Sequence, residues 1–79
     1  ANSEGMALAF QLLADGLGVE STLVEGTLEG QRHFWNRLSD DGGTHYVDLT
    51  RNRTGTTWSA EDLLSLGYLW ADAPESEEN

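Results

Sequence analysis

The chain contains no cysteine and no lysine, and it has a single proline. Without cysteine there is no disulfide framework, and no thiol can act as a nucleophile in this sequence. Four arginines supply all of the basic charge against fourteen acidic residues, so the net charge is −10. A surface this acidic repels phosphate backbones and anionic membranes, and we therefore expect neither nucleic-acid nor membrane binding.

Long hydrophobic runs are also missing. No apolar stretch approaches the ~20 residues of a membrane-spanning helix, and nothing resembles a signal peptide. We therefore expect a cytoplasmic protein. The 79 residues suffice for one domain, near the lower size at which a chain folds on its own core. Its expected extent is residues 1–70, followed by an acidic, disordered tail over residues 71–79.

Hydrophobic spacing predicts the main elements. Apolar residues recur at helical intervals from Gly5 to about Asp15, and Leu8 and Leu12 widen the stripe, which predicts a largely buried helix. Residues 19–25 read as a strand, and Ser59 followed three residues later by an acid predicts the start of a second helix. The expected fold is α+β: an N-terminal helix packed on a three-stranded antiparallel sheet, with a short helix at the C-terminal end.

The most informative stretch reads as two strands joined by a tight turn at Asp41-Gly42. A turn centred on Asp40-Asp41 places His33 directly opposite Asp48, whereas one centred on Asp41-Gly42 makes them diagonal neighbours on one face. Both registers bring an imidazole and a carboxylate within reach. Such a pair can orient a catalytic histidine, and it can also be a purely structural hydrogen bond.

Four motifs carry a resemblance to a known family. They are Gly-Met-Ala at 5–7, Gly-Leu-Gly-Val at 16–19, His-Phe-Trp-Asn at 33–36 and Tyr-Val-Asp-Leu-Thr at 46–50. In this order they resemble the transglutaminase-like core of the papain superfamily, and they are similar to small bacterial proteins of the YunG type. The resemblance implies a cysteine that opens the helix, a histidine that starts a strand and an aspartate that ends the next strand.

Ala7 stands where the resemblance places the cysteine. A thiol there would be activated by the positive end of the helix and by an imidazolium, and free amides of the first turn would hold an oxyanion. Alanine removes the nucleophile. The resemblance therefore implies either an engineered, inactivated cysteine enzyme, which we favour, or a natural pseudoenzyme.

With a thiol restored, His33 would act as base and then acid, and Asp48 would orient it. The reaction would be acyl transfer at an amide bond of a peptide or protein: hydrolysis, deamidation or transfer to an amine. We expect no metal and no cofactor. The expected substrate cleft comprises Gly5, Met6 and Trp35.

The alternative is a non-catalytic interaction module that holds a peptide or partner protein in the same cleft, with a preference for basic partners. Asn36 and Arg37 fall near the hairpin end, where we expect them to be solvated. Trp70 either pins the second helix or joins Leu66 and Tyr68 in an exposed apolar patch, which would indicate a partner or a homodimer.

Overall fold

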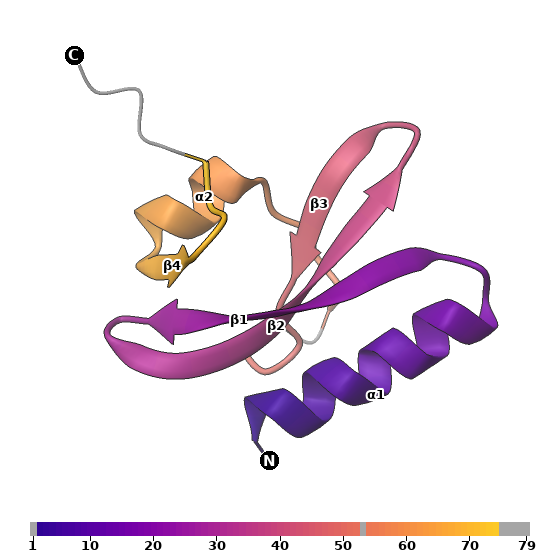
Figure 1. Cartoon of the computed structure of the whole chain (residues 1–79), viewed down its shortest axis with the longest axis horizontal. Helices are drawn as coiled ribbons and strands as arrows, with labels where there is room; N and C mark the ends of the chain where they lie inside the picture. Colours follow the sequence, from indigo (N-terminus) through magenta and orange to yellow (C-terminus); the bar gives the residue numbers. More distant parts are fainter. Residues whose placement is uncertain (1, 53, 75–79) are drawn as a thin grey trace.

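A computed structural model describes residues 2–52 and 54–74 of the chain. The elements in order are α1 (Ser3–Gly16), β1 (Glu20–Leu28), β2 (Gln31–Asp40), β3 (Gly43–Val47), α2 (Ala60–Ser65) and β4 (Tyr68–Trp70). The four strands form one antiparallel sheet in the order β3-β2-β1-β4 (Figure 1). The α+β class is as expected, and β4 is a strand that the hydrophobic pattern did not predict.

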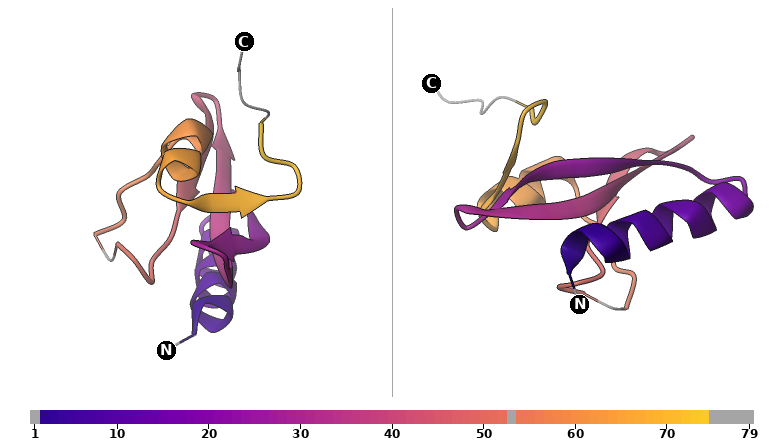
Figure 2. Two further views of the ribbon diagram at one scale, coloured as in Figure 1. Left: turned by 90° about the vertical axis from the view of Figure 1, so that its left-hand side faces the viewer. Right: turned by 60° about the horizontal axis from the view of Figure 1, so that its bottom comes forward.

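The two helices cover opposite faces of the sheet (Figure 2). Neighbouring residues on a strand point to opposite faces, and β2 shows both environments: Trp35 belongs to the core beneath α2, whereas Asn36 bonds to Ala7 of α1. The larger core therefore lies between the sheet and the α2–β4 segment. Its buried members are Val24, Leu28, Trp35, Tyr46, Leu63, Tyr68 and Trp70.

Helix α1 begins two residues earlier than the apolar spacing predicts. Asn2 caps it, because its Oδ1 accepts a hydrogen bond of 2.6 Å from the amide of Gly5. The predicted broad buried stripe is wrong: Leu12 and Leu17 are 73% and 80% exposed. The helix instead docks through a narrow strip of small residues, whose buried members are Ala7 and Ala14.

The β2–β3 hairpin has the second of the two predicted registers. Asn36 pairs with Val47 and Asp40 with Gly43, so the turn is centred on Asp41-Gly42. The prediction that Asn36 is solvated is wrong, because its side chain is 1% exposed and its Nδ2 donates to the carbonyl of Ala7 at 2.9 Å. A buried amide needs such a partner, and only the packing of α1 supplies it.

Strand β4 returns the chain to the free edge of β1, where Gly26 pairs with Trp70 and Leu28 with Tyr68. Both aromatic residues are buried, so the prediction that they form an exposed patch is wrong. Trp70 shares the core with Leu63 of α2, which agrees with the prediction that it pins the second helix. Leu66 alone of the predicted patch stays outside, at 49% exposed. Residues 75–79 of the predicted tail lie outside the described part of the chain.

Neither helix within residues 2–52 and 54–74 combines the length and the apolar character that crossing a bilayer demands.

Candidate functional site

The predicted His33–Asp48 pair is present. His33 lies near the start of β2 and Asp48 directly follows β3, and His33 Nε2 is 2.7 Å from Asp48 Oδ2. The side chains are 15% and 2% exposed, so the pair is shielded from water on most sides. The diagonal register explains the contact, because Asp48 continues β3 one residue past the last paired position, Val47.

Asp48 accepts hydrogen bonds on both carboxylate oxygens. Oδ2 accepts from His33 and from the hydroxyl of Tyr68, while Oδ1 accepts from the amide and the hydroxyl of Thr50 at 3.1 and 2.6 Å. Burial opposes the charged form, but the hydrogen bonds from Thr50, Tyr68 and His33 outweigh it and leave the pKa of Asp48 below its usual value. The carboxylate is therefore ionised at neutral pH, and the hydrogen between it and His33 lies on Nε2.

Tyr68 is a member of this site that the sequence reading assigned to another role. Its hydroxyl donates to Asp48 Oδ2 at 2.6 Å from the opposite end of the chain. Burial, and then the hydrogen bond and the charge of Asp48, raise the pKa of Tyr68 well above its usual range, so the phenol stays protonated and keeps donating. No short-range pattern links Tyr68 to Asp48, since only the pairing of β4 with β1 brings them together.

One ring nitrogen of His33 makes hydrogen bonds, and the other makes none among the described residues. Nε2 faces Asp48 and lies 3.3 Å from the hydroxyl of Thr50, whereas Nδ1 has no hydrogen-bond partner among the described residues. With its hydrogen on Nε2, the neutral ring presents a lone pair at Nδ1, as a general base requires. Trp35 stacks near one side of the ring at a centroid distance of 6.0 Å, and Tyr68 meets it edge-on at 6.1 Å.

Ser3 is the second residue that the sequence reading missed. It is the first residue of α1, and its Oγ accepts a hydrogen bond of 3.1 Å from the amide of Phe34, the residue that follows His33. The β2–β3 pairing stops at Asn36, so β3 does not reach this amide and the helix end takes its place. The sequence signal for this role of Ser3 is that a polar residue directly follows Asn2, the residue that caps the helix.

The other predicted site residues lie elsewhere on α1 or in the core. The prediction that Ala7 lies in the first helical turn is wrong, because α1 begins at Ser3 and places Ala7 one turn later, 4% exposed beneath the helix. Gly5 donates its amide to Asn2, and Met6 is half-buried. Trp35, at 1% exposed, supports the imidazole from inside the core and does not line an open cleft.

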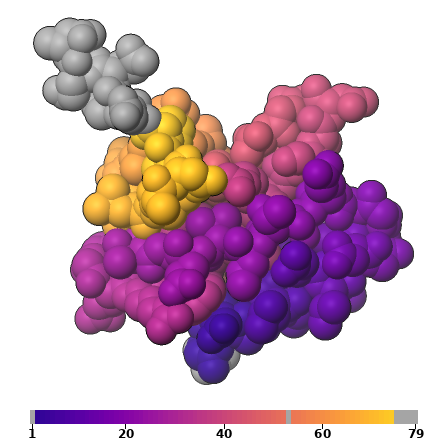
Figure 3. Space-filling view, viewed as in Figure 1, coloured from indigo at the N-terminus to yellow at the C-terminus, as the bar shows by residue number. Residues whose placement is uncertain are grey.

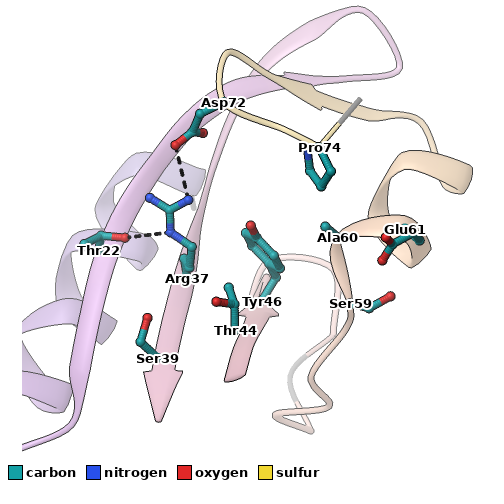
Figure 4. A pocket seen from close by; sticks show the side chains of 10 residues that line it. All are labelled: Thr22, Arg37, Ser39, Thr44, Tyr46, Ser59, Ala60, Glu61, Asp72 and Pro74. Atoms are coloured by element: carbon teal, nitrogen blue, oxygen red, sulfur yellow. Dashed lines mark hydrogen bonds and ion pairs between the residues drawn. The ribbon is translucent and has the colours of Figure 1, made fainter. Parts of the chain in front are cut away.

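Two open hollows are lined by other residues. One, of about 290 Å³, lies beside Tyr68 and is lined by Glu29, Arg51, Asn52, Trp58, Leu66 and Tyr68. The larger, of about 660 Å³, is centred on Arg37 (Figure 4). No cluster of three histidine, aspartate or glutamate side chains able to hold a metal ion occurs in the described ranges.

Comparisons of the chain with protein-family models, curated proteins and solved structures find no match. Function is therefore argued from the geometry of the site.

Proposed function

We propose that the chain carries a hydrolytic site in which His33 is the general base and Asp48 is the carboxylate that orients the imidazole. The observation that carries this is the contact between them: Nε2 of His33 lies 2.7 Å from Asp48 Oδ2, and Nδ1 has no hydrogen-bond partner among the described residues. A histidine oriented in this way acts as the base of catalytic sites on unrelated folds. Ser3 is not part of this site, because α1 covers the face of the sheet opposite to the one that carries Trp35 and, two residues before it on the same strand, His33.

The proposed reaction starts when a water molecule attacks a carbonyl carbon and its proton passes to Nδ1 of His33. The tetrahedral intermediate then collapses and expels the leaving amine or alcohol, which takes the proton from His33. The acid is released, and the imidazole is again free to accept a proton.

The order of elements supports a transglutaminase-like core as the class. A helix precedes three antiparallel strands, with the histidine on the second strand and the aspartate just after the third. In this proposal water takes the place of the thiol, because Ala7 stands where the class has its nucleophile. Amide or ester groups of peptides and proteins are the proposed substrates.

A non-catalytic module is the second candidate, and one observation favours it. No described side chain makes a hydrogen bond with Nδ1 of His33, so the described residues supply no nucleophile beside the imidazole. In that case the cleft would hold a partner peptide without turning it over.

The test is hydrolysis of p-nitrophenyl acetate by the full chain between about pH 5 and 9. We expect His33→Ala to lower the rate at least tenfold, because it removes the general base, and Asp48→Asn to lower it as well. His45→Ala removes the other histidine, which pairs with Asp40 in the hairpin and lies outside the site, and it should leave the rate unchanged.

Each outcome assigns the site. A rate lost in His33→Ala and kept in His45→Ala would support the catalytic proposal. Equal rates in the parent chain and in His33→Ala, in variants whose circular dichroism matches the parent chain, would contradict it and favour the binding module.

A further inference from the structure

The larger hollow lies on the same sheet face as His33 but includes neither His33 nor Asp48 in its lining. Figure 3 shows it as a notch between the C-terminal segment and the β2–β3 hairpin. Thr22, Ser39, Thr44, Tyr46 and Ser59 contribute hydroxyl-bearing side chains, and Arg37, Ala60, Glu61, Asp72 and Pro74 complete the lining (Figure 4). At about 660 Å³ it is within the size range of small-molecule sites.

Arg37 is the only cation among the lining residues, and a hydrogen bond to Thr22 of β1 fixes its guanidinium. Nε donates to the hydroxyl of Thr22 at 3.3 Å, and the side chain is 29% exposed. Hydrogen bonding to Tyr46, which outweighs partial burial, and the nearby Asp72 raise the pKa of Arg37, so the charge is permanent. A fixed guanidinium that points into a hollow is suited to recognise a planar anion.

Asp72, the ion-pair partner of Arg37, contacts only one nitrogen of the guanidinium. Asp72 Oδ2 meets Nη1 through one contact of 3.3 Å, longer than the 2.7–2.9 Å typical of charge-assisted hydrogen bonds. The Asp72 side chain is 69% exposed and lies just past β4. Such exposed single-contact pairs contribute little to stability, so an incoming carboxylate can displace this one.

We infer that this hollow is a binding site for a carboxylate-bearing peptide ligand, which Arg37 would grip through both oxygens in place of Asp72. The hydroxyls of Thr22, Ser39 and Thr44 are spaced over three strands around the guanidinium and can serve the ligand's amide groups. Asp72 then competes with the ligand's carboxylate for the guanidinium of Arg37. Because the rest of the chain is strongly acidic, selectivity for the carboxylate must come from this one guanidinium.

The test is an NMR titration of ¹⁵N-labelled full chain at constant ionic strength. The probe is N-acetylglutamic acid α-amide, which has one carboxylate and two amide groups, and N-acetylglutamine α-amide is the uncharged control. We expect saturable shifts at Arg37, Ser39 and Thr44 with the first probe and none with the second. Asp72→Asn should tighten binding about two- to fivefold, the range that corresponds to loss of an exposed ion pair.

Matched variants separate the site from general charge effects. Arg37→Gln should abolish the saturable shifts and Arg37→Lys should weaken them, whereas Arg32→Gln makes the same charge change outside the hollow and should leave them intact. Asp41→Asn, in the exposed hairpin turn, controls for Asp72→Asn. Equal shifts from both probes, retained binding in a folded Arg37→Gln chain, or no saturable binding in Asp72→Asn would each overturn the inference.

Discussion

Tyr68 and His33 donate hydrogen bonds to the same oxygen, Oδ2 of Asp48, at 2.6 and 2.7 Å. The two donors come from strands that β1 separates in the sheet, Tyr68 from β4 and His33 from β2. Their shared acceptor ties the orientation of the imidazole to the docking of the C-terminal segment. Tyr68 is therefore a positioning residue for the proposed catalytic pair, acting on His33 through Asp48.

Replacing Tyr68 with phenylalanine should raise the pKa of Asp48, because one of the hydrogen bonds that favour the charged carboxylate is lost. Leaving that oxygen with one donor fewer should also lower the free energy of unfolding by about 1–2 kcal/mol. The pKa is read from the ¹³C shift of the Asp48 carboxyl across a pH titration. Tyr46→Phe removes a hydroxyl elsewhere in the same core and should leave that titration unchanged; an identical response in both variants would contradict the role of Tyr68.

Acid should destabilise the chain through Asp48. The pKa of its carboxyl lies below the ordinary value of 3.8, so at low pH the unfolded chain binds the proton more readily than the folded one. This contribution to stability is fully present above about pH 5 and is lost as the pH falls through the lowered pKa of the folded state. Urea unfolding from pH 7 to 2 should show a shallower pH dependence for Asp48→Asn than for the parent chain. Asp41→Asn should keep the parent dependence, and a parallel curve for Asp48→Asn would refute the assignment.

Replacing Ser21 with alanine should stabilise the fold. Ser21 is 8% exposed on β1, and its hydroxyl has no hydrogen-bond partner in the described part of the chain. A buried unpaired hydroxyl costs about 1–3 kcal/mol in mutational series, and alanine removes it with little loss of volume. We expect the urea midpoint to rise in Ser21→Ala and to stay constant in Ser39→Ala, whose side chain is exposed on the neighbouring strand. A lower midpoint for Ser21→Ala would indicate a bound water at this hydroxyl.

Gly26 should not tolerate alanine. It lies where β4 pairs with β1, and a Cβ there would collide with the backbone carbonyl of Leu69 and lie 2.8 Å from the Trp35 ring and 2.9 Å from Trp70 Cβ. Since backbone cannot yield as a flexible side chain does, we expect Gly26→Ala to cost roughly 1–3 kcal/mol or more. Gly16→Ala, with nothing within 4 Å, should be neutral or slightly stabilising. Thermal unfolding of the two variants checks this, and equal midpoints would argue against close packing of β4.

The parts that the sequence predicted correctly depend on contacts close along the chain. The Asp41-Gly42 turn fixes the hairpin register, and the register places His33 beside Asp48, so a local pattern suffices for half of the site. Likewise Ser59 and Asp62 cap α2 reciprocally, as their spacing predicts.

The parts that it missed depend on packing between distant segments. Helical periodicity makes Leu12 a core residue, but α1 meets the sheet through Ala7 and Ala14 and leaves Leu12 outside. Tyr68 lies in a strand of three residues, too short to show alternation, and pairing with β1 alone gives it a place beneath Asp48. Hydrophobic periodicity does not identify Ser3, which is polar. Its hydrogen bond to the Phe34 amide exists because β3 stops before it reaches that amide.

The position of β4 sets the order in which the site can be completed during synthesis. Ser3, His33 and Asp48 all emerge from the ribosome before α2 and β4, and domains fold as their segments become available. Until residues 60–70 follow, Asp48 lacks its Tyr68 donor and the aromatic core lacks Leu63 and Trp70. A nascent chain can therefore carry both residues of the proposed catalytic pair without holding them in place, and β4, which is made after them, secures the site.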